Sequence, residues 1–359
     1  MGLATFIIRR LLWVIPTMLG VSILVFGVTL LFSPEIRAAI YIRNPQDLRD
    51  PTGEAKPIEQ IIIDFGFDRP PHEQYLRWLG GVLRGDLGFS KTSNMLVLDA
   101  LVTKLPRTAE IVLPCIPIVV VVGIYLGVLS ATHRDSVIDH ATRVFAIFGW
   151  SLPTFWVAIM LLAIFFGVLG WFPPGAMGFP LGSPGSIFVQ TNPSWHWYTG
   201  LCTIDGLLNG QLWITMDALL HLVLPTMTLT IISIALIIRI MRSSMLETLN
   251  KSYIITAKAK GLKSSQVINK HARRNALIPV ATVSGLLVAG LLTGVVITET
   301  IFDIQGLGRW AAQAAGMGWG TPDIPAIMGF ALFTCIIYVM ANLIVDIMYA
   351  YLDPRIRLG

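Results

Sequence analysis

The chain alternates long apolar runs with polar segments. Several runs reach the ~20 apolar residues that a membrane-spanning helix needs. They lie at about Leu11–Phe32, Pro106–Ala131, Arg143–Leu169, Leu219–Ile240, Ala276–Thr298 and Pro325–Tyr351. Pro153 is expected to break the third run, because a proline removes a backbone donor and disfavours helix before it. The pattern predicts an all-α integral membrane protein with six transmembrane helices.

The basic residues give these six spans an orientation. Arg9 and Arg10 precede the first run, whereas the loop Trp171–Asp217 contains no Lys or Arg. Basic residues gather on the cytoplasmic side of membrane proteins. We therefore expect a multi-pass protein of the cell (inner or cytoplasmic) membrane with both termini cytoplasmic. No small-residue cleavage site follows the first run, so we read it as a retained span.

The same pattern divides the chain into three parts. Residues 1–33 hold the N-terminus and span 1, residues 34–105 form a polar extracytoplasmic segment, and residues 106–359 form the core with spans 2–6. Within the polar segment, Pro70 and Pro71 fit the start of a helix. Asp86–Ser90 is expected to turn the chain afterwards.

The composition excludes most soluble and catalytic classes. Hydrophobic residues make up 54% and charged residues 13% of the chain, whereas soluble domains carry about 25% charged residues. The sequence contains no phosphate-binding loop, H-E-x-x-H or G-x-S-x-G motif. Its histidines and three cysteines are scattered, so we expect no metal site, no cofactor and no catalysis. Nothing in the sequence indicates a nucleic-acid partner.

Ionisable residues of the apolar runs gather near the ends of the spans: Glu110, Arg239, Arg242, Glu299 and Asp346. Such residues are often functional, but here pairing at the interface is the simpler interpretation. Asp346, for instance, is expected to pair with a basic residue of the inner surface. No ladder of acids crosses the bilayer, which argues against a carrier driven by protons or sodium.

The basic loop, residues 242–275, is the most distinctive cytoplasmic segment. Read as a helix, Tyr253, Ala257 and Gly261 share one face, where small side chains would let another surface approach closely. Gly261 is expected to end this helix, and Ser264 or Ser265 to cap a second short one. Cations surround it: Lys258, Lys260, Lys263, Lys270, Arg273 and Arg274. The loop either docks a partner protein or rests on anionic lipid.

A second distinctive segment is the aromatic loop on the opposite side of the membrane. Trp195, Trp197, Tyr198 and Trp213 lie within or beside it. They fit the belt of aromatic residues found at membrane interfaces, which we favour. They would also suit stacking on a sugar ligand.

Short motifs along nearly the whole chain identify a family. They are DLGFS at Asp86, LPRTAE at Leu105, SLPTFW at Ser151, GWFPPG at Gly170, HLVLP at His221, RSSMLE at Arg242, YIITAKAKGL at Tyr253, HARRNALIP at His271, TETIFDIQGLGR at Thr298 and NLIVDIMYAYLDPRIR at Asn342. In their number and order the chain resembles the permease subunits of peptide-type ABC importers, the dipeptide, oligopeptide and nickel class. It is most similar to the first of the two permeases in such systems. The resemblance implies the type I importer permease fold.

The resemblance also implies a role for the basic loop, which in this family carries the force of ATP binding and hydrolysis into the spans. The implied coupling residues are Tyr253, Ala257, Lys258, Ala259, Gly261, Leu262, His271 and Asn275. Ala257 and Gly261 match the small positions of the family motif, whereas Ile255 and Thr256 occupy the region of its leading Glu. The implied partners are a second homologous permease, two cytoplasmic ATP-binding subunits that hydrolyse ATP, an extracytoplasmic substrate-binding protein and membrane lipid.

The resemblance leaves the substrate open. Peptides are its default, and an oligosaccharide substrate is the alternative. The chain departs from the family pattern in the segment SPEIRAAIYIRNPQD, at Gln305 and in the long loop Trp171–Asp217, all on the outer side. More distant alternatives are a stand-alone channel and a membrane anchor or sensor that recruits a cytosolic protein.

Overall fold

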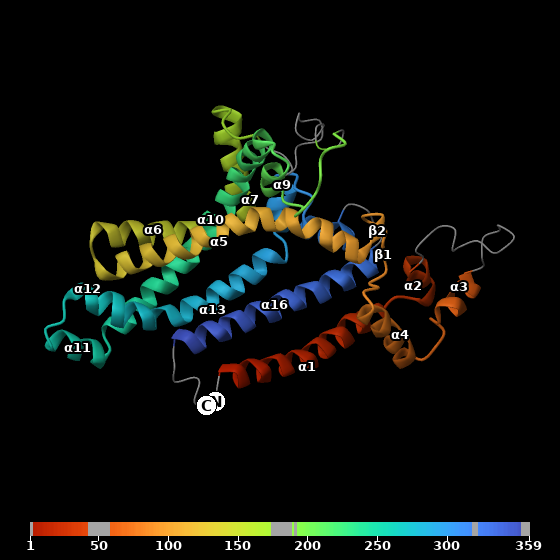
Figure 1. Ribbon diagram of the computed structural model, residues 1–359, viewed down its shortest axis with the longest axis horizontal. Helices are drawn as coiled ribbons and strands as arrows, with labels where there is room; N and C mark the ends of the chain where they lie inside the picture. The colour runs from red at the N-terminus through yellow and green to blue at the C-terminus, as the bar shows by residue number, and fades with distance from the viewer. Residues whose placement is uncertain (1–2, 42–57, 174–188, 190–191, 318–321, 353–359) are drawn as a thin grey trace.

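Long helices running alongside one another form the body of the computed structural model, which describes residues 3–41, 58–173, 189, 192–317 and 322–352. They are α1 (Leu3–Thr29), α5 (Val97–Thr132), α10 (Leu212–Leu249), α13 (Arg273–Leu292) and α16 (Ile324–Leu352) (Figure 1). The described residues include five helices that are long and apolar enough to span a membrane, or six if one bent pair counts as a single span. The all-α membrane fold is confirmed, and the count of six depends on that pair.

The bent pair is the third predicted span. It consists of α6 (Val137–Ser151), α7 (Thr154–Leu161) and the π-helix η2 (Leu162–Val168). The direction of the chain bends by 104° between α6 and the continuous segment formed by α7 and η2. Leu152 adopts an extended conformation before Pro153, as a residue preceding proline prefers. The predicted break at Pro153 is confirmed.

Two of the long helices, α5 and α10, form the centre of the core, because glycines let them approach closely. A Cβ added at Gly123 would lie 2.7 Å from Ile237, and one at Gly127 would lie 2.6 Å from Met241. Both helices extend beyond the predicted spans, since α5 begins before Pro106 and α10 continues to Leu249. The packed core therefore continues into the base of the basic loop, where Met245 is fully buried.

The connections gather at opposite ends of these helices (Figure 1). One end, called here the loop end, carries α11 (Ser252–Ala259), α12 (Ser264–Gln266) and the π-helix η3 (Val267–Ala272). The other connections are grouped here as the far end. Those at the opposite end are α2 (Pro34–Tyr41), α3 (Ile58–Phe65), α4 (Pro71–Leu83), the hairpin β1 (Phe89–Ser90) and β2 (Met95–Leu96), and α15 (Leu307–Ala314), whereas α9 (Cys202–Leu208) and α14 (Val296–Ile301) contact α5 further along, at Glu110 and Thr108.

The polar segment at the far end follows the sequence prediction in part. Helix α4 has Pro70 at its N-cap and begins at Pro71, as expected. The chain then turns at Gly85 and Gly88, both with positive φ. The short hairpin that follows was not predicted. The end of the segment SPEIRAAIYIRNPQD, from residue 42 on, part of the loop Trp171–Asp217 and the basic tail Asp353–Arg357 lie outside the described residues.

Candidate functional site: the basic loop and its support

The basic loop folds as two short helices around a glycine. Helix α11 ends at Ala259, and Gly261 follows with φ +74°, a left-handed conformation that favours glycine. A Cβ at Gly261 would meet nothing within 4 Å, so backbone conformation and not lack of space favours glycine. The predicted helix end is confirmed. The predicted serine cap is wrong, because Lys263 is the N-cap of α12 and no side chain caps it.

The loop rests on the core through its apolar side chains. Ile254, Val267 and Ala272 are buried and belong to the same cluster as Met245 of α10. Ser244 donates a hydrogen bond of 2.9 Å to the carbonyl of Ala276, which ties α10 to α13. These contacts fix the base of the loop against the spanning helices.

The face predicted from the spacing of Tyr253, Ala257 and Gly261 is not a single surface. Ala257 is only 8% exposed and packs into the core of the chain itself, whereas Tyr253 is 43% exposed. Gly261 lies beyond the end of α11. Tyr253 and Ala257 do lie one helical turn apart in α11. Packing against α10, which one segment's periodicity cannot reveal, decides that the small residue points inward.

The other residues predicted to take part in coupling lie mostly at the surface of the loop. Lys258, Ala259 and Leu262 are exposed. His271 is half-buried, and its carbonyl accepts a 2.9 Å hydrogen bond from the amide of Asn275. The exposed side also contains the cations Lys260, Lys263, Lys270, Arg273 and Arg274 and the apolar side chain of Ile255. A basic surface with apolar side chains at its centre suits a protein partner with acidic groups.

An ion pair ties the loop to the end of α10. Lys251 Nζ lies 2.7 Å from Glu247 Oε1, four residues earlier. The hydrogen bond to this carboxylate raises the pKa of Lys251. Both side chains are largely exposed, so the pair adds little to stability.

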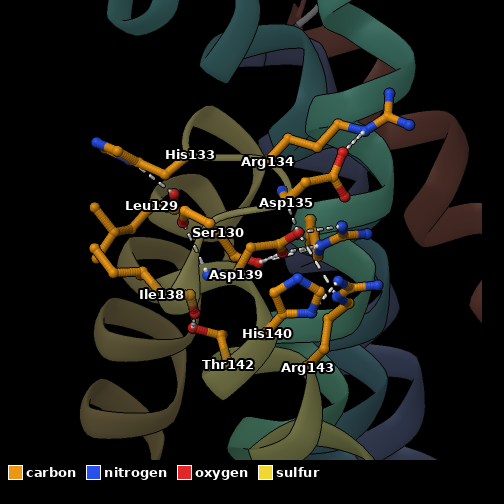
Figure 2. A network of polar contacts seen from close by, with 12 residues as sticks. Leu129, Ser130, His133, Arg134, Asp135, Ile138, Asp139, His140, Thr142 and Arg143 are labelled. Carbon is orange, nitrogen blue, oxygen red and sulfur yellow. Dashed lines mark hydrogen bonds and ion pairs between the residues drawn. The ribbon is translucent and has the colours of Figure 1, made fainter.

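A buried polar cluster stands directly behind the loop, between α5, α6 and α10. Asp139, fully buried, lies at its centre (Figure 2). Its Oδ1 accepts hydrogen bonds from Ser130 Oγ at 2.6 Å and Arg242 Nε at 2.7 Å, and its Oδ2 accepts one from Arg242 Nη2 at 2.9 Å. Arg143 Nε lies 3.6 Å from the same carboxylate. A forked guanidinium–carboxylate contact is among the strong hydrogen-bonding arrangements.

This cluster joins segments that are distant in sequence. The expected pairing of Arg242 is confirmed, but its partner Asp139 was not identified from the sequence. Asp139 also accepts a 3.0 Å hydrogen bond from the backbone N–H of Asp135, next to the turn that links α5 to α6. The cluster therefore fixes that turn to the part of α10 from which the basic loop departs.

Carboxylates at the far end bind neutral donors instead. Glu299 is fully buried, and it accepts hydrogen bonds from Thr108 Oγ1 at 2.7 Å and from the backbone N–H of Arg309 at 2.7 Å. Glu110 accepts one of 2.6 Å from the backbone N–H of Thr203. These contacts hold α5 against α9, α14 and α15. Sequence reasoning placed both acids at span ends but missed Thr108, whose role depends on a residue far away in the chain.

Asp346 behaves as the sequence suggested. Arg10 Nη2 lies 3.0 Å from its Oδ1, and this ion pair joins α1 to α16. The described residues contain no group of three or more His, Cys, Asp or Glu side chains placed to hold a metal ion.

The aromatic residues at the far end divide into two groups. Trp195 is 9% exposed and packs edge-to-face on Trp197, with ring centroids 5.6 Å apart. Trp197, Tyr198 and Trp213 are exposed. The aromatic belt at this position stays a prediction.

The fold is that of a membrane protein whose basic loop is anchored in the core, and the comparisons identify it as a membrane transport subunit. Residues 123–358 match the family model described as "Binding-protein-dependent transport system inner membrane component". The chain belongs to this family, and the resemblance found in its motifs is confirmed.

Curated relatives match almost the full length of the chain. The dipeptide transport system permease protein DppB of Escherichia coli K12 is 36% identical over 358 residues, 98% of each chain. The di/tripeptide transport system permease protein DppB of Pseudomonas aeruginosa is 35% identical over 353 residues, again 98% of each. The oligopeptide transport system permease protein AppB of Bacillus subtilis is 34% identical over 357 residues, 99% of this chain and 100% of the relative.

Proposed function

We propose that this chain forms one half of the translocation pathway of an ATP-driven importer for short peptides. A second homologous permease supplies the other half, and an extracytoplasmic binding protein delivers the peptide at the far end. Two ATP-binding subunits dock beneath the pair of permeases and hydrolyse the ATP, with the basic loop as the docking surface of this chain, so this chain performs no bond chemistry. The relatives, all peptide permeases by name, favour peptides over oligosaccharides.

The observation that carries this proposal is the construction of the basic loop. Its inner side is anchored in the core by Ile254, Ala257 and Val267, and its outer side exposes cations and apolar side chains. A partner pushing on such a loop displaces α10 and α13 with it, because the loop is not free to move alone. Binding and hydrolysis of ATP would then shift the pathway between states of different peptide affinity.

The direct test is reconstitution. The complex is purified with the ATP-binding subunits, second permease and binding protein encoded beside this chain, and ATP hydrolysis is measured with dialanine and with maltotriose. Stimulation by dialanine is expected. Stimulation by maltotriose alone would indicate an oligosaccharide substrate. If the chain never co-purifies with an ATPase, the importer proposal fails and a membrane anchor or sensor becomes the better interpretation.

Docking on the basic loop is tested at Gly261. Replacing Gly261 by Arg forces a side chain into left-handed backbone and onto the exposed surface, so co-purification of the ATP-binding subunits should fall. Gly210 is a matched control at the far end. It is exposed, its φ is +69°, and a Cβ there also meets nothing within 4 Å.

Gly210→Arg imposes a similar backbone strain and added bulk without touching the loop. We expect it to retain the ATP-binding subunits. Equal co-purification of Gly261→Arg and wild type would contradict the docking assignment. Equal loss in both variants would point to misfolding.

The proposed topology places the basic loop in the cytoplasm. A cysteine replacing the exposed Ser264 should react with impermeant maleimide only in inverted vesicles, and one replacing Ser194 at the far end only in intact cells. The native Cys115 and Cys202 are buried, and the half-buried Cys335 is replaced by Ser, so background labelling should be low. Labelling of Ser264→Cys from outside would overturn the topology.

A further inference from the structure

Two cavities lie along one face of α10. The first, of about 330 Å³, is lined by Leu229 and Ile232 of α10 together with hydroxyl-bearing residues, including Thr154 and Thr298. The second, of about 470 Å³, lies nearer the loop end between α6 and α10 and includes Arg239. Ile232 and Arg239 are separated by about two helical turns, so they point to the same side of α10. The bend between α6 and α7 separates the two cavities.

The second cavity is cationic with apolar walls. Arg143, Arg239 and Arg242 line it, alongside the apolar Ala146, Ile147 and Ile238 and the ring of Trp150. Two of its arginines, Arg143 and Arg242, face the carboxylate of Asp139. The single buried acid cannot balance three cations, so the cavity is left with net positive charge.

Arg239 differs from the other two arginines. Its guanidinium carbon lies 5.0 Å from the centroid of the exposed Trp150 ring, and no ion pair among the described residues includes it. Contact with an aromatic face orients a guanidinium while leaving its N–H groups at the edge available. An ionisable residue at the end of a span whose partner is not a protein carboxylate is a candidate binding group.

We propose that the Arg239 cavity binds the terminal carboxylate of the peptide on its way toward the loop end. This inference rests on the proposed function, because it takes the cargo to be a peptide and the face of α10 to border its pathway. A planar guanidinium matches a carboxylate with two parallel hydrogen bonds. The contact lies at an exposed site, where charge pairs are weak. Weak binding suits a site from which the peptide must leave.

Ser243 lines this cavity. Replacing it by Cys tests whether the cavity is positively charged and open to water. In the assembled complex, with Cys335 replaced by Ser, Ser243→Cys is treated with anionic and cationic methanethiosulfonates of similar size. Each rate is divided by the rate of the same reagent with a small free thiol in solution, and on this scale the anionic reagent should react faster. Adding Arg239→Gln should reduce this preference roughly fivefold, as for removal of one nearby charge, and Arg239→Lys should preserve it.

Two results would overturn the site. An unreactive Ser243→Cys would mean that lipid or the second permease covers this face. Equal reaction rates with both reagents, in wild type and in Arg239→Gln, would mean that the cavity does not concentrate anions.

The carboxylate itself is tested by transport. Proteoliposomes containing the assembled complex are given trialanine or trialanine amide, with loading of the binding protein measured for each. Arg239→Gln should reduce uptake of trialanine by up to about fivefold, the loss of one exposed charge pair. The uptake of the amide, expressed relative to wild type, should change far less, and Arg239→Lys should recover part of the trialanine uptake.

Arg84→Gln is the matched control, because Arg84 is an exposed arginine of the far end. It should leave both uptakes unchanged. Equal loss of acid and amide uptake in Arg239→Gln would refute the carboxylate site while leaving the importer intact. A wild-type complex that imports neither peptide would refute the proposed function instead.

Discussion

The loop end and the far end both bury carboxylates, but they neutralise them differently. At the loop end the charge of Asp139 is matched by the guanidinium of Arg242 at 2.7 Å. At the far end Glu299 receives only neutral donors, the hydroxyl of Thr108 and a backbone N–H. Removing one partner of a buried ion pair leaves an uncompensated charge inside the protein. Removing a neutral hydrogen-bond donor lowers the free energy of unfolding by less. The two ends should therefore differ in their response to single substitutions.

The largest effect is expected from breaking the pair behind the basic loop. Arg242→Ala leaves the fully buried Asp139 without its main counter-charge, which should destabilise the chain by about 3 kcal/mol. The thermal unfolding midpoint of the detergent-purified protein measures the loss. The double variant Asp139→Asn/Arg242→Ala should recover part of it. A double variant that is less stable than Arg242→Ala would show that the charge of Asp139 is not the cause.

A smaller effect is expected at the far end. Thr108 Oγ1 donates to Glu299 and accepts a 2.8 Å hydrogen bond from the backbone N–H of Leu307. Thr108→Val keeps the shape and removes both bonds, which should cost about 1–2 kcal/mol. Thermal unfolding again measures it, with Thr17→Val at an exposed position as control. A loss equal to that of Arg242→Ala would remove the distinction between the two ends.

The smallest effect is expected at the surface of the loop end. Glu247→Gln removes the exposed ion pair with Lys251. Since water already solvates both groups, no measurable change in the unfolding midpoint is expected. A clear drop would show that the contact is shielded in the folded protein.

The sequence predicted what depends on local chemistry. The break at Pro153, the start of α4 at Pro71 and the end of α11 before Gly261 all follow from backbone preferences of single residues. The folding of the basic loop as a pair of short helices is likewise local. The existence of the loop and its basic character could be read directly from residues 242–275.

What the sequence could not provide are contacts between distant segments. Thr108 meets Glu299, and Asp139 meets Arg242, only because α5, α6, α10 and α14 are brought together by packing. The same packing turns Ala257 inward, although its spacing suggested a surface position. The serine cap failed for a different reason, since the helix begins at Ser264 itself and Lys263 precedes it.

The unbroken length of α10 has a mechanical consequence. Its 38 residues correspond to about 57 Å at the usual helical rise, well beyond the thickness of a bilayer core. When such a helix tilts about one end, the other end moves by a distance that grows with the length of the helix. A tilt of about 5° at its base would swing the opposite tip by about 5 Å, close to one helical pitch. A small tilt of the end of α10 next to the basic loop is thus geometrically sufficient to move its N-terminal end by several ångströms.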